Sequence, residues 1–370
     1  MKILSVVGAR PNFMKVVPII RAAKKYKNIT HILVHTGQHY DHVMSGSFFK
    51  DLGIPRPNIN LGIGSGSHAA QTGRIMIEFE KVLLTYQPDV VLVVGDVNST
   101  LACSIVTVKL RIPLAHVEAG LRSRDRDMPE EINRLVTDCV ADILFTTSPD
   151  ANLNLEKEGL PKTRIFFVGN VMIDTLFNNI NRAEKSKILS KLSLYKKHYA
   201  LMTLHRPSNV DSAKTLASIL SAVKMIQNKI KIVFPVHPRT LKNIKHFMPK
   251  ESLQSMKNLL LINPLGYHDF LKLMKNAKFV MTDSGGIQEE TTALGVPCLT
   301  LRENTERPIT VTHGTNILVG MNKNLLIKES LKILNGKSKK GQRPKYWDGR
   351  ASLRIIQKLI SLKQKNRLLR

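Results

Sequence analysis

The chain has 370 residues, of which 43% are hydrophobic, and it carries 56 Lys and Arg against 28 Asp and Glu. Such a length exceeds one ordinary hydrophobic core and predicts two domains. The hydrophobic fraction excludes a disordered protein, and no apolar run approaches the roughly 18 residues that a membrane helix needs. We therefore expect no membrane partner.

The net charge of +28 raises the hypothesis of a nucleic-acid-binding protein. Aromatic residues make up only 5% of the chain, which is few for base stacking, and no zinc-finger or RNA-recognition signature is present. Most of the excess is lysine dispersed through helical segments, with a dense stretch over 323–370. The charge fits a solvated surface that also attracts an anionic substrate, and we predict no nucleic-acid partner. Salt-dependent binding to DNA would support the alternative of a nucleic-acid-binding protein.

The N-terminal segment and the cysteines both indicate a cytoplasmic protein. The apolar stretch before Arg10 is short and predicts a strand leading into a functional loop rather than a signal peptide. Cys103, Cys139 and Cys298 are scattered without metal-ligand spacing, and we interpret them as core thiols in a reducing compartment.

Apolar segments of strand length alternate with helical segments through the first half of the chain. After the first strand we expect a loop with Arg10 and Pro11, and then a helix through Tyr26. Continuous apolar strands separated by amphipathic helices indicate a parallel sheet covered on both faces, which binds ligands beyond the carboxyl ends of its strands. The predicted strands are 2–8, 31–37, 90–95, 113–119, 143–148 and 164–169.

The pattern starts again after a charged stretch over 182–197, which we expect to be a surface helix. The strands predicted here are 199–205, 231–237, 258–263, 278–284 and 296–302, and helical periodicity returns from Arg350. The fold class is thus α/β, with two Rossmann-like doubly wound domains facing a cleft. The expected bounds are 1–172 for the first domain, 173–350 for the second, and 351–370 for a C-terminal helix that packs back on the first.

Two glycine-rich segments have different meanings. Gly62, Gly64 and Gly66 do not directly follow a good strand and lack the spacing of a dinucleotide fingerprint, so we predict a loop before a helix from His68. That weakens any nicotinamide oxidoreductase hypothesis. By contrast, TDSGGIQEE (282–290) joins an apolar strand to a helical stretch. Its backbone N–H groups at the helix N-terminus would bind a phosphate.

The residues of this second segment have definite candidate roles. Ser284, Gly285 and Gly286 would expose the N–H groups, and Glu290 could accept hydrogen bonds from ribose hydroxyls. The alternative is a plain helix capped by Ser284. Downstream, Arg302 and Arg307 offer cations near the same strand edge, although they could form surface ion pairs.

Polar residues in the first half gather at strand ends. Three carboxylates converging beside cations are typical of an acid/base site, although Asp96 and Glu130 could instead cap helices. Glu118 ends an apolar strand and is not a cap, so it is the hardest to explain structurally. His205 ends the first strand of the second half and has a structural or a functional role. The first-half candidates are Arg10, Lys15, Asp96, Glu118, Glu130 and Arg134.

A set of motifs running from Lys2 to about Ala351 resembles the non-hydrolysing UDP-N-acetylglucosamine 2-epimerases of bacteria and archaea. They are GARPNFMK, TGQHYD, GDVNST, HVEAGLRS, MPEEINR, TLHRPSNVD, DSGGIQEE, LRENTERP and WDGRA, in that order. The resemblance implies a glycosyltransferase-B-like fold, a homodimer and interconversion of UDP-GlcNAc and UDP-ManNAc for cell-surface polysaccharides. It implies a UDP-sugar as the only small-molecule partner, with neither cofactor nor metal.

The resemblance also assigns roles position by position. The catalytic positions are Asp96, Glu118, Glu130 and His205, with His205 stabilising charge on the leaving phosphate. The substrate-binding positions are Arg10, Lys15, Arg134, Phe270 at the uracil, Ser284, Gly285 and Gly286 at the diphosphate, Glu290 at the ribose, and Arg307 near the phosphates.

This chain departs from the family pattern in two places. The stretch between Arg122 and Glu130 is shorter than in some members, which leaves the register of Glu130 against Glu131 open. The segment HYDHVMS after Gln38 differs from that of members activated by their own substrate, so a regulatory second UDP-GlcNAc site is not implied. The alternatives to this function are a 2-epimerase for a modified UDP-sugar, a hydrolysing epimerase, and a UDP-sugar glycosyltransferase.

Overall fold

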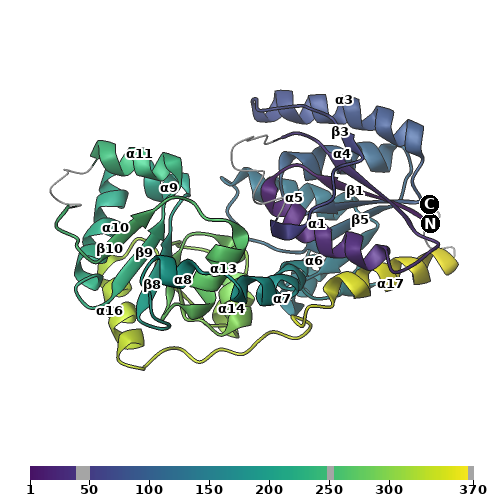
Figure 1. The fold of residues 1–370 in the computed structure, drawn as a ribbon. Helices are drawn as coiled ribbons and strands as arrows, with labels where there is room; N and C mark the ends of the chain where they lie inside the picture. Colours follow the sequence, from purple (N-terminus) through teal and green to yellow (C-terminus); the bar gives the residue numbers. More distant parts are fainter. Residues whose placement is uncertain (39–50, 248–253, 366–370) are drawn as a thin grey trace. The chain divides into compact units, whose positions relative to one another are not determined.

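The computed structural model describes residues 1–38, 51–247 and 254–365, and its contacts divide the chain into two compact units (Figure 1). Unit 1 comprises Met1–Asn178 and Lys345–Arg370, and unit 2 comprises Asn179–Pro344. The division falls inside helix α7 (Val171–Glu184), as does residue 172, where we expected the first domain to end. The segment HYDHVMS lies outside the described residues.

Unit 1 is built on a seven-stranded sheet in the order β3-β2-β1-β4-β5-β6-β7. All pairings among its described strands are parallel, as the continuous apolar runs predicted. The strands are β1 (Lys2–Val7), β2 (Thr30–His35), β3 (Ile59–Asn60), β4 (Val90–Val94), β5 (Leu114–Ala119), β6 (Ile143–Thr146) and β7 (Ile165–Phe167). The short edge strand β3 was not predicted.

The helices of unit 1 follow the expected alternation, with one correction. Helix α1 begins at Arg10 itself rather than after a loop, because Pro11 suits the first turn and Asn12 Oδ1 accepts the backbone N–H of Ala9 at 2.9 Å. The described helices are α1 (Arg10–Ala23), α3 (His68–Tyr86), α4 (Asn98–Lys109), α5 (Pro129–Val140), α6 (Pro149–Lys157), the 3₁₀ helix η1 (Lys162–Arg164) and α17 (Ala351–Gln364). As expected, α3 starts at His68, directly after the glycine-rich loop.

Unit 2 contains a six-stranded parallel sheet in the order β10-β9-β8-β11-β12-β13. Its strands are β8 (Tyr199–Thr203), β9 (Lys231–Pro235), β10 (Leu259–Ile262), β11 (Val280–Thr282), β12 (Cys298–Thr300) and β13 (Asn316–Leu318). Its further helices are α8 (Ile188–Lys191), α9 (Pro207–Val210), α10 (Ala213–Ile226), α11 (Pro238–Phe247), α13 (Tyr267–Asn276), α14 (Gly285–Leu294), α15 (Pro308–Thr312) and α16 (Lys323–Leu334).

The surface helix expected over 182–197 was wrong in extent. That stretch holds the end of α7 and then only the short α8, because Ile188 turns inward and Ser193 adopts a positive φ of 49°, which ends the helical path. Among the described helices, none has the length and apolar character needed to cross a membrane.

Two of the three cysteines lie in the core and one does not. Cys103 and Cys298 are buried, whereas Cys139 is exposed, so its interpretation as a core thiol was wrong. Helix α5 buries a polar face that includes Arg134 and Asp138. One residue further along a helix is a rotation of about 100°, which turns Cys139 away from that face.

The end of the chain belongs to unit 1. Trp347 is 1% exposed, and its indole N–H donates to the carbonyl of Thr147 at 2.9 Å. Asp174 on α7 accepts the backbone N–H groups of Ala351 and Ser352 at the start of α17, at 3.0 and 2.7 Å. Helix α17 packs along α1, so the last helix of the chain covers the first (Figure 1).

Candidate active site

In unit 1, the carboxyl ends of β1, β4 and β5 bring Lys15 and Glu118 into contact. Lys15 Nζ on α1 lies 2.5 Å from Glu118 Oε2, and the two residues are only 6% and 3% exposed. The other carboxylate oxygen, Oε1, is buried and has no hydrogen-bond partner among the described residues. Burying a carboxylate oxygen without a partner is costly, so this atom calls for a proton or a ligand.

The backbone at Glu118 also has an unusual conformation. Its φ is +73°, and the pairing of β5 with β6 shifts register between Val117 and Ala119. Glu118 is therefore the extra residue of a β-bulge, which turns its side chain out of the regular alternation. A non-glycine residue in this region costs of order 1–3 kcal/mol, and such strain clusters at functional sites.

Arg134 and Asp96 form the second charged contact of this cluster. Asp96 follows β4, and its Oδ2 pairs with the buried guanidinium of Arg134 on α5. The Asp96 side chain is 27% exposed, so it is within reach of a ligand. The cap position of α4 is Val97, and Asp96 is not its cap. Asn133 ties the turn down by donating to the Asp96 carbonyl at 2.8 Å.

The two adjacent glutamates of α5 have different surroundings. Glu131 is 2% exposed and accepts hydrogen bonds from the Ser123 and Arg124 amides and from Arg134. Burial alone would raise the pKa of Glu131, but the Ser123 amide and Arg134 outweigh it and hold that pKa below its ordinary value. Glu130 is half-buried, and none of the side-chain hydrogen bonds or ion pairs among the described residues involves it. Within this part of the chain, its carboxylate is therefore the one of the pair that is not already engaged.

Arg10 is the first residue of α1 and is exposed. Asn12 fixes this end of the helix against the sheet, because its Nδ2 donates to the Val94 carbonyl at the end of β4 at 3.0 Å. The start of α1 is thereby joined to the turn that carries Asp96.

In unit 2, Asp283 organises the residues around His205. Asp283 is completely buried and accepts the backbone N–H groups of His205 and Arg206 at 3.0 and 2.9 Å, and the Asn209 amide at 3.0 Å. His205 Nδ1 lies 2.8 Å from Asp283 Oδ1, while 48% of the histidine side chain is exposed. Burial would raise the pKa of Asp283, but His205 outweighs it and lowers that pKa. The ionised carboxylate holds Nδ1–H and leaves Nε2 for other chemistry.

The predicted anion site lies at the N-terminus of α14. Ser284 occupies the N-cap position, yet its side chain makes no capping hydrogen bond within the described part of the chain. A Cβ at Gly285 would lie 2.6 Å from a guanidinium nitrogen of Arg307, so only glycine lets the arginine approach this turn. Arg307 is held in place by Glu306 and by Glu289, whose Oε1 lies 2.8 Å from Arg307 Nε.

Glu290 is buried one turn further into α14, where the Tyr267 hydroxyl donates to its Oε1 at 2.8 Å. Burial, with a contribution from the Glu289 carboxylate, raises the pKa of Glu290 to about 7, although the bond from Tyr267 acts in the opposite direction. Phe270 is half-buried on α13, three residues after Tyr267 and on the same helix face.

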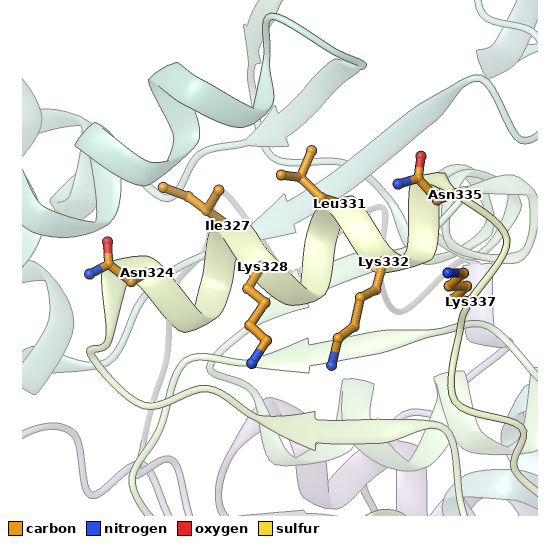
Figure 2. Close-up of a pocket in the computed structure, with 7 residues that line it drawn as sticks. All are labelled: Asn324, Ile327, Lys328, Leu331, Lys332, Asn335 and Lys337. Atoms are coloured by element: carbon orange, nitrogen blue, oxygen red, sulfur yellow. The ribbon is translucent and has the colours of Figure 1, made fainter.

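The predicted residues thus fall into two groups. Unit 1 brings together Lys15, Asp96, Glu118 and Arg134. Arg10 lies on α1 with Lys15, and Glu130 lies on α5 with Arg134. Unit 2 holds His205, Phe270, Ser284, Gly285, Gly286, Glu290 and Arg307. A hollow on the surface of α16, lined by Ile327, Leu331 and several lysines, includes none of them (Figure 2).

Several buried partners were missed from sequence: Glu131, Asp138, Tyr267, Asp283, Glu289 and Glu306. The position of Asp283 directly before Ser284 was a usable signal, since a carboxylate at a strand end commonly orients its neighbours. Glu131 and Asp138 lie in an ordinary amphipathic pattern, which conceals that α5 buries its polar side.

Comparison with known proteins places this arrangement in a family. The family model described as UDP-N-acetylglucosamine 2-epimerase matches residues 21–360. A UDP-N-acetylglucosamine 2-epimerase homolog of Methanococcus maripaludis is 46% identical over 98% of this chain and 100% of the relative. A UDP-2,3-diacetamido-2,3-dideoxy-D-glucuronate 2-epimerase of Pseudomonas aeruginosa is 41% identical over 98% of this chain and 100% of its own.

A crystal structure of the Methanocaldococcus jannaschii UDP-GlcNAc 2-epimerase in complex with UDP-GlcNAc and UDP is also similar. It superposes with a TM-score of 0.89 at 46% identity, over 98% of this chain and 100% of that one. The motifs, the two parallel sheets and these matches over nearly the whole length agree: the chain belongs to the UDP-N-acetylglucosamine 2-epimerase family.

Proposed function

We propose that the protein reversibly epimerises UDP-N-acetylglucosamine at C2 to give UDP-N-acetylmannosamine, which supplies cell-surface polysaccharide synthesis. The observation that carries this proposal is the buried Glu118 carboxylate, with one oxygen on Lys15 and the other without a protein partner among the described residues. Membership of the family supplies the substrate class.

The reaction has to overcome the low acidity of the C2–H bond, which has no adjacent carbonyl. The UDP at C1 is a good leaving group, and in the α-linked sugar the C2 hydrogen is anti to the C1–O bond. A base removes this proton while the C1–O bond breaks, which forms a C1=C2 glycal and UDP. UDP then adds back to C1 while an acid delivers a proton to C2 from the other face. The products balance the substrate, and the C2 configuration is inverted.

The carboxylates of unit 1 supply the base and the acid in this proposal. The three candidates are Glu118 beside Lys15, Asp96 beside Arg134, and Glu130. The face of the sugar that each carboxylate meets decides whether it acts as the base or as the acid. Lys15 and Arg134 form ion pairs with Glu118 and Asp96, respectively. Arg10, at the exposed start of α1, contacts the nucleotide-sugar.

Unit 2 holds UDP in this proposal. The N–H groups of Ser284, Gly285 and Gly286 and the Arg307 guanidinium bind the diphosphate. Glu290 accepts hydrogen bonds from the ribose, and Phe270 lies against the uracil. His205, oriented by Asp283, stabilises charge on the leaving phosphate.

The proposal predicts a specific isotopic outcome. The purified protein, incubated with UDP-GlcNAc in D2O, should form UDP-ManNAc with deuterium at C2, because the removed proton exchanges before the sugar is protonated again. NMR of the sugar follows both events. Absence of both UDP-ManNAc and C2 deuterium would reject the function.

Glu118→Gln should lower kcat by at least about 100-fold, since the variant keeps the shape of the side chain but cannot exchange a proton. UDP affinity, measured by isothermal titration calorimetry, should be unchanged because the UDP groups lie in unit 2. Glu78→Gln, at a glutamate of α3 whose side chain is 42% exposed, is the matched control and should keep full activity. Full turnover by Glu118→Gln would remove Glu118 from the reaction.

UDP binding should depend on pH through Glu290. Ribose hydroxyls favour the ionised carboxylate, and with a pKa of about 7 in the free protein this group is mostly protonated at lower pH. Binding must then expel a proton, so affinity should fall by up to about tenfold per pH unit below that value and level off above it. Glu290→Gln should lack the part of the pH dependence that comes from Glu290. The titration of the UDP phosphate affects both proteins equally, so the comparison cancels it. Identical pH profiles from calorimetry would contradict the assignment.

A second candidate substrate is favoured by one relative. The 41% identical Pseudomonas aeruginosa protein is a 2-epimerase for a diacetamido-glucuronate linked to UDP, so a modified UDP-sugar is the alternative. Incubation with each sugar nucleotide, without an acceptor, identifies the substrate and separates an epimerase from a glycosyltransferase. Release of free ManNAc with UDP would indicate a hydrolysing enzyme.

We also propose that the protein is a cytoplasmic homodimer. Ile77 and Leu84 on α3 are 60% and 61% exposed, and they lie seven positions apart on one helix face, where a second copy could cover them. Light scattering after gel filtration should give twice the chain mass of 41.6 kDa. The double variant Ile77→Asp with Leu84→Asp should elute as a monomer, and an unchanged dimer would place the interface elsewhere.

A further inference from the structure

We propose that Asp138 is a positioning residue, which sets the geometry of both Glu118 and Asp96 by holding the backbone on either side of the β5 bulge. This inference rests on the proposed function for its catalytic consequence, and on unit 1 alone for its geometry. Asp138 lies on α5, is completely buried and contacts neither carboxylate directly in the contacts that the structure describes.

The two carboxylate oxygens of Asp138 bind on opposite sides of Glu118 in the chain. Oδ1 lies 2.6 Å from His116 Nδ1, two residues before Glu118. Oδ2 accepts the Gly120 backbone N–H at 2.9 Å, two residues after it, and lies 2.7 Å from a guanidinium nitrogen of Arg122. One rigid group therefore spans the bulge and holds both flanks of the strained residue.

His116 extends this clamp to the neighbouring turn. Its Nε2 lies 2.9 Å from the Gly95 carbonyl oxygen, and its Nδ1 faces the Asp138 carboxylate. The buried ring therefore joins the Asp138 carboxylate to the turn after β4. An amide at position 138 offers one acceptor oxygen in place of two, so it cannot keep all of these contacts.

Gly95 links the His116 ring to the proposed catalytic groups. Its N–H donates to the Val117 carbonyl at 3.1 Å, and it directly precedes Asp96. A Cβ at Gly95 would lie 2.8 Å from Lys15 Nζ and 3.7 Å from Glu118 Oε2, so its backbone packs against that ion pair. A shift of Gly95 would move Asp96 and disturb the Lys15–Glu118 contact together.

Arg122 supplies positive charge beside Asp138. It also binds Glu158 with two hydrogen bonds of 2.8 and 2.6 Å, so this one guanidinium joins the Asp138 and Glu158 carboxylates. Burial would raise the pKa of Asp138, but His116 and Arg122 outweigh it and hold that pKa below its ordinary value. The carboxylate is thus ionised, as the clamp requires.

The test is Asp138→Asn, which keeps the size of the side chain and removes its charge. We expect kcat for epimerisation to fall about 100-fold, as a misplacement near 1 Å produces, with KM and UDP affinity nearly unchanged. A crystal structure of the variant should show Glu118 out of the left-handed φ region. Wild-type kcat, or loss of UDP affinity in step with kcat, would overturn the proposal.

The matched control is Asp174→Asn. Asp174 is also a buried acceptor of two backbone N–H groups in unit 1, but it serves the start of α17 and not the bulge. It should lower the melting temperature and leave kcat unchanged. Equal losses of kcat in the two variants would mean that Asp138 has only a stabilising role.

Two further measurements keep the inference separate from the proposed function. In nitrogen-15 NMR, the Gly120 amide, which donates to Asp138 in the wild type, should exchange with solvent more slowly in the wild type than in Asp138→Asn. Equal exchange rates in the two proteins would overturn the clamp even if epimerisation is confirmed. If the wild type makes no UDP-ManNAc, the function fails, and the NMR spectrum and the φ of Glu118 still decide the geometry.

Should Asp138→Asn fail to fold, Arg122→Lys provides the same test in milder form. Lysine keeps the positive charge but cannot contact Asp138 and Glu158 together. We expect a smaller fall in kcat at unchanged KM, and wild-type kcat in this variant would count against the clamp.

Discussion

The contact on which the rest of unit 1 depends is the buried one between Lys15 and Glu118. A carboxylate removed from water has to find partners, and the fold provides one only for Oε2. The bulge, the bare backbone of Gly95 and the tilt of α1 set by Asn12 all serve to bring these two side chains together. An unsatisfied buried oxygen is unfavourable in the free protein, and it becomes favourable only when a substrate completes it.

In the proposed function, unit 2 has the opposite task, which is to attract an anion without collapsing around its own cations. Arg302 and Arg307 are each paired with Glu306, and Arg307 also with Glu289, so their positive charge is compensated and their positions are fixed before any ligand arrives. The remaining attraction comes from the amide groups at the start of α14, which cannot be neutralised by a side chain. The proposed function thus gathers acid/base chemistry in one unit and anion binding in the other.

Sequence reasoning recovered the sheet strands wherever burial on both faces produced a continuous apolar run. It missed β3 and β13, two short strands at sheet edges, although it found the edge strands β7 and β10 from the apolar segments that contain them. The residues at strand ends, such as Asp96 and Glu118, were identifiable because polar groups there have few structural explanations. The positive φ of Glu118 and the buried carboxylate of Asp138 could not be predicted, since a local pattern does not reveal which face of α5 turns inward or where the pairing of β5 shifts register.

The return of the chain to unit 1 through Trp347 has a consequence for its biogenesis. Helix α1 emerges early from the ribosome, yet the helix that covers it, α17, is the last to be translated. Throughout the synthesis of unit 2 the apolar side of α1 therefore lacks its cover, and the carbonyl of Thr147 lacks its indole donor. Unit 2, a single continuous segment, can mature while still attached to the ribosome, whereas the half that carries Glu118 is completed only after α17 has been translated.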